Sequence, residues 1–441
     1  MQASGMAKYR QGVDVSTSWG KLEYTGWADE QASWKESCYV GDWSYLDELF
    51  VEGHDALKFF SDFIVNSTAK FAIGQAKHVI CCNLDGKVIG EGILMRHGEQ
   101  SFEFNARGPV TPWLEYNLKK GGYDARSRCA IEHFKYQLSG PKSIFVAEQL
   151  TGTALRDIGF MHFRHETIAG QAVFMLRQGM AGEIGFEIHG PAAGADAVYA
   201  AILAAGRDFG LRRMGARTAM INHLEAGFPT VTHDYLPAVE GAAERDFFAM
   251  YDQPAPDDRG PAWFRSFERS LKIKGSFEAD DIGAWYRSPV ELGWARNVKF
   301  DHPFYGREAL EREVANPRRT IVSLLWNTDD CEDVVTSTMR PGEPYDFMDF
   351  PRHPWNCMYA CTVLKDGRPV GVATSRGFSH YFRQVLSHCV IDVELATPGT
   401  EVEVVWGDPG HRQKVIRAVV GAYPFKKDNR RADLATLPAA A

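Results

Sequence analysis

The sequence contains no Cys-x-x-Cys pair, although it has eight cysteines in 441 residues. Cys81 and Cys82 are adjacent, and Cys357 and Cys361 are four residues apart. This spacing does not support a zinc ribbon or a thioredoxin-like redox site, both of which use closely paired cysteines. We therefore expect reduced thiols that fill the core, and no metal site.

Long apolar runs and long basic runs are also missing. No apolar stretch approaches the roughly 20 residues that cross a bilayer, and residues 1–20 lack the apolar segment of a secretory leader. The chain has 49 basic and 57 acidic side chains, a net charge of −8, with no basic run of five or more. This balance argues against a general polyanion binder. We expect a cytoplasmic protein, monomer or homodimer, that binds neither membrane nor nucleic acid.

The first two thirds of the chain mix helical and strand patterns. Apolar residues at helical spacing predict a helix over residues 53–65 and another over 193–209, ending at Gly210. Residues 78–95 predict two strands joined at Asp85-Gly86, a hairpin signal, and further strands are expected at 101–105 and within 172–190. This mixture is typical of an α+β fold.

The pattern changes towards the C-terminus. Residues 254–261 contain three prolines and a glycine, which break regular structure. After Arg319 the chain shows short β-like runs at 321–326, 360–364, 385–393 and 401–406, separated by turn signals. A separate β-rich, barrel-like domain over residues 320–425 is therefore predicted.

Four segments, in this order, resemble the glycine-cleavage T-protein (aminomethyltransferase) family. Each segment is a weak signal alone, but the order and spacing make the set specific. The matches cover about residues 40–425 and lie at GHDALKFF (53–60), GMAGEIGFEI (179–188), GARTAMINHLEAG (215–227) and VKFDHPFYGREAL (298–310).

Within that family the chain looks most similar to the bacterial vanillate and 3-O-methylgallate O-demethylases, which act on lignin-derived aromatics. The features that carry this closer match are Trp27 and Trp34, residues 177–182, and His302, which stands where the family usually has lysine. The resemblance implies a three-domain clover leaf around a central folate channel. It implies two interleaved α+β domains within residues 1–315 (about 1–50 plus 140–315, and 50–140), and the barrel domain at 320–425.

The resemblance also implies the reaction. A methyl group passes from a methoxylated aromatic acid, of the vanillate, syringate or methylgallate type, to N5 of tetrahydrofolate. The products are a phenol and 5-methyltetrahydrofolate. Such a transfer needs the amine held in line with the methyl carbon, a stabilised or protonated phenolate and the exclusion of water.

By this resemblance, tetrahydrofolate is held by residues of the second and third segments and of one earlier strand. Glu187 is expected to grip the pterin ring, whose N–H groups suit a carboxylate. Glu91 stands where relatives carry an aspartate near the folate N5, and its neighbours Gly90 and Gly92 are expected to let a backbone or a ligand approach closely. Arg217 and Phe228 complete the expected cofactor-binding set.

The aromatic substrate is expected to contact a second group of residues. Arg107 matches an arginine that, in the aryl demethylases, binds the substrate carboxylate through paired hydrogen bonds. Trp43, Tyr45 and His233 are further candidates, because aromatic rings suit a flat methoxyarene. Trp27 and Trp263 could also line this aromatic pocket, and core packing is the alternative for each ring.

The chain departs from the aryl demethylases at Ala219, where the vanillate-type enzyme has a catalytic tyrosine. Alanine cannot donate a proton, so another side chain must stabilise the leaving phenolate, or the substrate differs. His223, Tyr235 and His233 are the candidates for the acid, and Glu91 completes the expected catalytic set. Three alternatives stay open: a chlorinated methoxybenzoate donor, a methylenedioxy arene donor, or a folate-binding relative without transfer chemistry.

Overall fold

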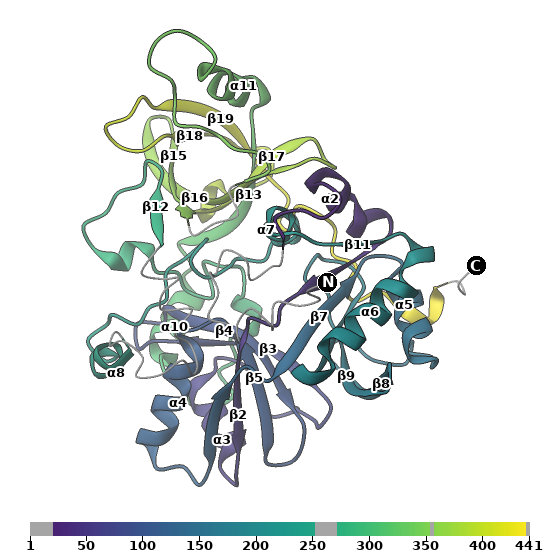
Figure 1. Ribbon diagram of the computed structural model, residues 1–441. Coiled ribbons are helices and arrows are strands. Elements are labelled where there is room, and N and C mark those ends of the chain that lie inside the picture. The colour runs from purple at the N-terminus through teal and green to yellow at the C-terminus, as the bar shows by residue number, and fades with distance from the viewer. Residues whose placement is uncertain (1–20, 252–270, 353–356, 438–441) are drawn as a thin grey trace.

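The computed structural model describes residues 21–251, 271–352 and 357–437. The predicted break at 254–261 and Trp263 lie outside these residues. Figure 1 shows a closed barrel above two sheets that lie side by side. A short helix, α7 (Ala216–Ala226), lies between the barrel and the sheets. No helix among the described residues is long and apolar enough to span a membrane.

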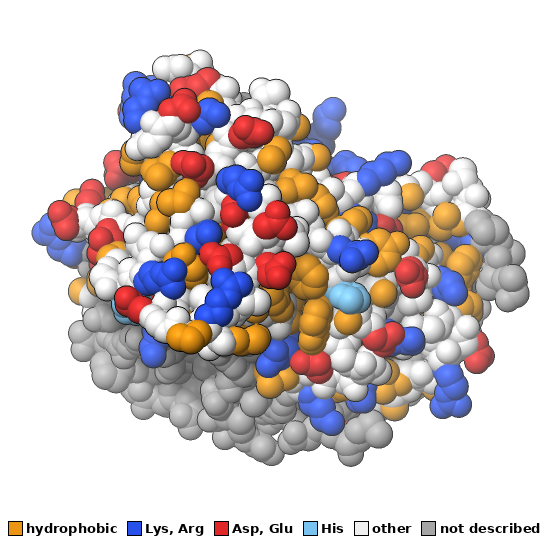
Figure 2. Space-filling view, turned by 90° about the horizontal axis from the view of Figure 1, so that it is seen from above, with side chains coloured by type: hydrophobic (Ala, Val, Ile, Leu, Met, Phe, Trp, Pro, Cys, Tyr) orange, Lys and Arg blue, Asp and Glu red, His pale blue; other side chains and the backbone are white. Residues whose placement is uncertain are grey.

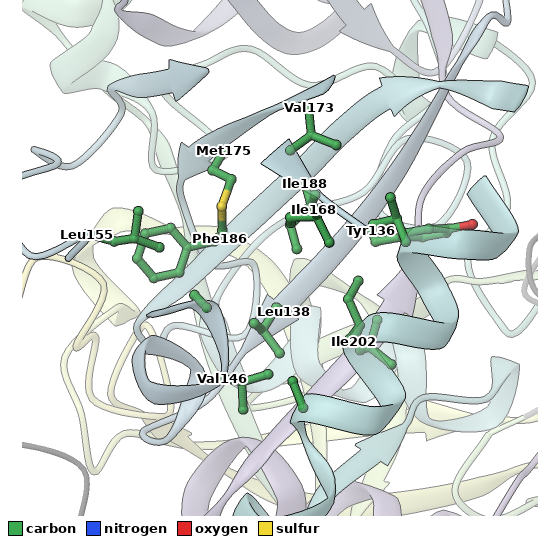
Figure 3. Packing of buried hydrophobic residues seen from close by; sticks show 14 of the residues in the cluster. Tyr136, Leu138, Val146, Leu155, Ile168, Val173, Met175, Phe186, Ile188 and Ile202 are labelled. Carbon is green, nitrogen blue, oxygen red and sulfur yellow. The ribbon is translucent and has the colours of Figure 1, made fainter. Parts of the chain in front are cut away.

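A six-stranded sheet forms one of the two lower parts. Its strands are antiparallel except for the parallel pair β1–β11. Helices α5 (Ser143–Thr151) and α6 (Ala195–Ala205) bury apolar side chains against it, and Figure 3 shows this packing. The strand order is β11 (Leu211–Arg213), β1 (Cys38–Asp42), β7 (His133–Ser139), β10 (Gly185–Pro191), β9 (Gln171–Arg177) and β8 (Phe163–Ile168).

A five-stranded antiparallel sheet forms the other lower part. Helices α3 (Ala56–Phe63) and α4 (Val110–Gly121) cover it with a core rich in phenylalanine. A short helix, α8 (Arg245–Tyr251), adds to the same core. The strand order is β3 (Ala76–Cys82), β4 (Val88–Arg96), β5 (Ser101–Ala106), β2 (Asp47–Glu52) and β6 (Arg126–Ala130).

The C-terminal part is a closed six-stranded barrel, entered through helix α10 (Arg307–Ala315). Helix α11 (Thr328–Ser337) was not predicted; it begins after Asn327, whose side chain caps it by accepting from the Asp330 N–H. The predicted runs also left out two barrel strands, at 368–379 and 414–421. The barrel order is β13 (Arg319–Trp326), β17 (Gln384–Asp392), β16 (Arg368–Ser379), β15 (Cys361–Lys365), β18 (Glu401–Trp406) and β19 (Lys414–Gly421), and β12 (Lys272–Lys274) pairs with β14 (Cys357–Tyr359) beside it.

Helix α7 (Ala216–Ala226) joins these parts. Every residue in it is buried except Arg217. It packs against helix α2 (Trp27–Glu36) and against the barrel strand β16. A Cβ at Gly377 of β16 would lie 2.5 Å from the Ile221 side chain, so the barrel backbone approaches α7 as closely as glycine allows.

The predicted α+β fold with a C-terminal barrel is confirmed. The strands at 78–95 and 101–105 are found as predicted. Both predicted helices are shorter than expected: the one over 53–65 is Ala56–Phe63, and the one over 193–209 is Ala195–Ala205, followed by a separate 3₁₀ turn that ends at Gly210. Along the chain, all five strands of the five-stranded sheet come between β1 and β7, which belong to the other sheet. The two sheets therefore interleave in sequence. The proposed domain limits near 50 and 140 stay predictions.

Candidate functional site

Glu187, on β10, is held by three neighbouring donors. Its Oε1 accepts hydrogen bonds from the side-chain amides of Gln178 (2.6 Å) and Gln137 (3.5 Å), and its Oε2 accepts one from His189 Nε2 (3.2 Å). The carboxylate stays partly accessible, with 12% of the side chain exposed. A carboxylate has about four acceptor positions, so this arrangement fixes its orientation and leaves capacity for a ligand with N–H groups.

Glu91, on β4, is paired with a histidine on the neighbouring strand. His78 Nε2 lies 2.8 Å from Glu91 Oε2, and the Asn297 amide lies 3.3 Å from His78 Nδ1. Because a carboxylate only accepts, Nε2 carries the proton and Nδ1 accepts from Asn297. The three residues form a chain of hydrogen bonds that ends on a half-buried carboxylate.

The glycines beside Glu91 allow close packing of neighbouring elements. A Cβ at Gly90 would lie 2.6 Å from Val110 of α4, and one at Gly92 would lie 2.4 Å from the Asn105 carbonyl oxygen. These positions need glycine because α4 and β5 pack there. The expected close approach of a backbone is confirmed at Gly92, and the approach of a ligand stays a prediction.

Aromatic rings connect the α7 region to the Glu91–His78 pair. The Trp43 ring stacks on His223 (6.4 Å between centroids), His223 meets Phe228 (5.9 Å), and Phe228 meets His78 (5.5 Å). Trp294 contacts His78, Phe228 and Tyr235, so it closes the group. The spacing of each pair is that of favourable aromatic contacts.

The end of α7 places two of these rings side by side. Gly227 follows the helix in the left-handed conformation (φ 62°), and its N–H donates to the His223 and Leu224 carbonyls. Phe228 N–H also donates to the His223 carbonyl oxygen (2.9 Å). Such a glycine cap ends the helix sharply, and the next residue, Phe228, turns back beside His223.

His223 is buried, and its Nδ1 lies 3.0 Å from the Ala219 carbonyl oxygen. Nδ1 therefore carries the proton, and Nε2 has a free lone pair. Burial, with a contribution from Arg107, lowers the pKa of His223 to about 4. This environment favours the neutral ring, whose Nε2 can accept a hydrogen bond. The expected role of His223 as an acid stays a prediction.

Arg107 follows β5 and approaches several candidate residues at once. Its guanidinium lies 5.4 Å from the centre of the Tyr45 ring. Its charge contributes to the lowered pKa values of His223 and His233. The ring contact and the charge effects connect Arg107 with Tyr45 and both histidines, and its expected role towards an anionic ring substituent stays a prediction.

The segment 230–235 carries the remaining candidates. Burial, reinforced by Arg352 and Arg107, holds the pKa of His233 well below its usual value. Burial, with the charges of Glu91 and Asp234, holds the pKa of Tyr235 well above its usual value. Its hydroxyl group has no hydrogen-bond partner within the part of the chain that the structure describes.

Asp234 anchors this segment to the barrel. Its Oδ1 accepts from Thr374 Oγ1 (2.7 Å) and His388 Nδ1 (3.1 Å), and its Oδ2 accepts from the Thr230 N–H (2.8 Å). Burial alone would raise the pKa of Asp234, but the charge and hydrogen bond of His388 outweigh it and hold the pKa below its usual value. The carboxylate is thus fully committed within the protein.

The other predicted site residues have different surroundings. Trp43 and Tyr45 are buried in an apolar cluster that also contains Ala219, so much of each ring fills the core. Arg217 lies in the first turn of α7 and pairs with Glu23 (3.1 Å). The described contacts do not bring Arg217 to the aromatic group. Trp27 packs on Phe378 and His380 instead.

Sequence reasoning missed several residues at this site. His78, Asn297 and Trp294 come from two chain segments more than 200 positions apart, and Arg352 lies next to the barrel. None belongs to a local motif. Strand alternation gave the only available signal, because side chains two residues apart share a face and the pairing of β3 with β4 puts His78 on the same face as Glu91.

Two family models match the chain: the GCVT N-terminal domain over residues 7–243, and the glycine cleavage T-protein C-terminal barrel domain over residues 353–425. The chain belongs to the glycine-cleavage T-protein family. The barrel model covers five of the six strands that close the barrel, and β13 precedes the matched residues.

Several relatives in this family align with nearly the whole chain. A sesamin methylene transferase of Sinomonas sp. is 36% identical over 95% of this chain and 93% of the relative. A syringate O-demethylase of Sphingobium sp. is 32% identical (91% and 89%), and an aminomethyltransferase of Thermoanaerobacter pseudethanolicus is 24% identical (92% and 94%). The chain is accordingly an enzyme of the methyl-transferring type, and the alternative of a non-catalytic relative is not supported.

The fold comparison agrees. The crystal structure of the glycine cleavage aminomethyltransferase T from Bartonella henselae superposes with a TM-score of 0.65 over 92% of each chain, at 20% identity. At this identity the likeness shows the T-protein fold.

Proposed function

We propose that this enzyme is a tetrahydrofolate-dependent O-demethylase of a methoxylated aromatic acid. The observation that carries the proposal is the run of rings from Trp43 through His223 and Phe228 to His78, with Arg107 beside it and Glu91 at its end. A flat ring with a carboxylate fits an aromatic surface next to a guanidinium. The 32% identity to a syringate O-demethylase supports the same donor class.

The residues present fit a bound folate. The Glu187 carboxylate is oriented by Gln137, Gln178 and His189 and stays partly accessible, so it can accept N–H donors of a pterin. Phe228 is half-buried and offers a ring face next to the Glu91–His78 pair. When bound, tetrahydrofolate supplies the amine that takes the one-carbon group.

The protein's own residues bind and polarise the substrate. Arg107 pairs with the carboxylate and sets the ring orientation. Tyr235 keeps its proton because its pKa is raised, so its hydroxyl group can donate to the aryl oxygen on which negative charge develops. The His223 Nε2 lone pair can accept from a neighbouring ring hydroxyl group. The Glu91 carboxylate can accept the proton that the amine loses.

A second donor is favoured by one specific observation. The sesamin methylene transferase is 36% identical over almost its whole length. Ala219 is buried among aromatic side chains and supplies no hydrogen-bond donor to a departing phenolate, which is consistent with a different substrate. A methylenedioxy arene would give its bridging carbon to two folate nitrogens, and the two displaced protons would complete the two phenol groups. The folate product is then methylene- rather than methyltetrahydrofolate.

One experiment separates the two donors. Purified protein is incubated with tetrahydrofolate and three ring compounds: a hydroxymethoxybenzoate, its neutral methoxyphenol analogue and a methylenedioxybenzoate. Mass spectrometry then identifies the folate product. The proposal expects methyltetrahydrofolate from the hydroxymethoxybenzoate. Methylene-tetrahydrofolate from the bridged compound alone would establish the second donor, and no folate product from any ring ether would overturn both.

A further inference from the structure

Arg352 is a buried arginine without an acidic hydrogen-bond partner among the described residues. It is 3% exposed, and its one described hydrogen bond runs from NH2 to His233 Nδ1 (3.4 Å). Its NH1 has no partner in the described chain. Burying a guanidinium without a carboxylate partner costs considerable free energy, which the rest of the fold must offset.

The acidic groups whose charges act on Arg352 are already engaged. Asp234 accepts from His388, Thr374 and Thr230, as described above. Asp349 pairs with Arg376 NH2 (2.6 Å). Arg352 is therefore directed at His233 rather than neutralised by a carboxylate.

The contact decides which nitrogen of His233 is protonated. A guanidinium only donates, so His233 Nδ1 must accept and the single proton of the neutral ring sits on Nε2. Protonation of both nitrogens would bring a second positive charge against Arg352, with Arg107 also nearby. His233 is thus held as a neutral ring with a fixed N–H donor.

His223 carries the opposite arrangement. Its Nδ1–H donates to the Ala219 carbonyl oxygen, so its Nε2 is an acceptor. The charges of Arg107 and His223 both act on His233, so the three side chains lie around the same region of the site. A donor and an acceptor imidazole there match an ether oxygen, which only accepts, and a hydroxyl group, which can donate.

We propose that Arg352 is a positioning residue that fixes His233 with its proton on Nε2, so that His233 donates a hydrogen bond to the ether oxygen as it departs. The inference rests on the proposed function. In that step the carbon–oxygen bond breaks and its electron pair moves to the aryl oxygen, while the carbon bonds to the amine. The proton lost by the amine balances the charge and ends on the phenol. His233 lends a hydrogen bond and no proton.

The first test reads the tautomer directly and needs no activity. Protein labelled with ¹⁵N-histidine is examined by long-range ¹H–¹⁵N correlation, and His233 is assigned by the signals lost in His233→Gln. We expect protonation at Nε2 in the wild type and a shift towards Nδ1 or a mixture in Arg352→Met. Protonation at Nδ1 in the wild type, or no change in Arg352→Met, overturns the inference.

Two further variants control for structural damage. Arg287→Met removes another arginine that is 3% exposed, one that donates to the Ala284 and Tyr286 carbonyl oxygens (2.8 Å each), and should leave the His233 signals unchanged. Arg352→Lys keeps a donor and a charge, so it should retain the Nε2 tautomer and serves as the test if Arg352→Met does not fold. A His233 signal that moves equally in Arg287→Met, or that is lost from Nε2 in Arg352→Lys, contradicts the assignment.

A kinetic test follows on the same proteins. Arg352→Met should lower kcat by about 10- to 100-fold with little change in KM, because the lost hydrogen bond strengthens only as charge develops. Arg352→Lys should restore part of the rate, and Arg287→Met should keep it. A rise in KM alone would make Arg352 a binding residue and overturn the proposal. If no variant or wild type forms a folate product, the proposed function fails while the tautomer result stands by itself.

Discussion

His223 donates from Nδ1 to the carbonyl oxygen of Ala219, one turn earlier in α7, at 3.0 Å. The residue that lacks a functional side chain thus fixes the tautomer of a neighbouring histidine through its backbone. Because the same histidine is buried, its pKa falls to about 4. The vanillate-type enzymes are expected to carry a tyrosine, which can donate, at the position of Ala219. Here the pair offers an acceptor instead, the Nε2 atom of His223.

The lowered pKa of His223 predicts a pH-dependent stability. Its folded pKa lies below the unfolded value of about 6.5, so the unfolded state binds more protons between about pH 4 and pH 6.5. Stability from the neutral ring is complete above that window and is lost as the pH falls through it. Between pH 7.5 and pH 5 the wild type should lose about 2 kcal/mol more unfolding free energy than His223→Gln.

Urea denaturation at the two pH values measures this difference. His54→Gln is the matched control, since the His54 side chain is 77% exposed. That variant should follow the wild-type pH dependence. Equal losses in the wild type and His223→Gln would show that His223 is not buried in a neutral form.

Glu187→Gln should weaken tetrahydrofolate binding by about 1.5–3 kcal/mol, the range for a hydrogen bond to a charged group. The neutral amide can accept at one atom only and would face the donor amides of Gln137 and Gln178. Calorimetric titration of folate measures the change. Glu166→Gln, on β8 of the same sheet, should bind folate normally, and unchanged affinity in Glu187→Gln would remove Glu187 from the site.

Arg107→Ala should raise KM for carboxylated rings and have a smaller effect on neutral methoxyarenes. The reason is that a carboxylate loses a bidentate partner, whereas a neutral ring loses only packing against the arginine stem. Steady-state kinetics with matched acid and neutral donors give the comparison, and Arg126→Ala, a highly exposed arginine, is the control. Equal losses for both donor classes would instead assign Arg107 to structure or folate binding.

Local patterns were sufficient for much of the fold. Alternation and turn residues predicted the β3–β4 hairpin, and the short runs after Arg319 predicted four of the six barrel strands, because these elements depend on neighbours in sequence. Helix α11 was missed because its capping residue, Asn327, directly follows a strand and its own apolar face is narrow.

The site was less predictable for a physical reason. Glu187 was named from a motif, and its donor His189 lies two residues away on the same strand, but Gln137 of β7 meets it only through the sheet. His78 and Asn297 are brought together by packing of a loop on the five-stranded sheet. The glycines beside Glu91 show the same limit, since a sequence does not reveal whether a backbone, a helix side chain or a ligand occupies the space at a glycine.

Tyr235 gives the sharpest test of catalysis, because its structural and catalytic roles predict opposite results. Its hydroxyl group is buried and makes no hydrogen bond within the described residues, so Tyr235→Phe removes an unsatisfied polar atom. If the role is structural, stability should be unchanged or slightly raised and activity kept. If the hydroxyl group donates to the departing aryl oxygen, kcat should fall by about 10²-fold or more with the fold intact.

The rate should then depend more steeply on the leaving group in Tyr235→Phe. Donors with graded phenol pKa values are compared in the wild type and the variant, since a phenol of low pKa leaves without help. Tyr136→Phe is the control with the reverse pattern: its hydroxyl group donates to the Ala195 carbonyl (3.2 Å), so it should lose about 1 kcal/mol of stability and keep kcat. Parallel slopes in the wild type and Tyr235→Phe would exclude Tyr235 as the donor and leave His233, oriented by Arg352, to stabilise the departing oxygen alone.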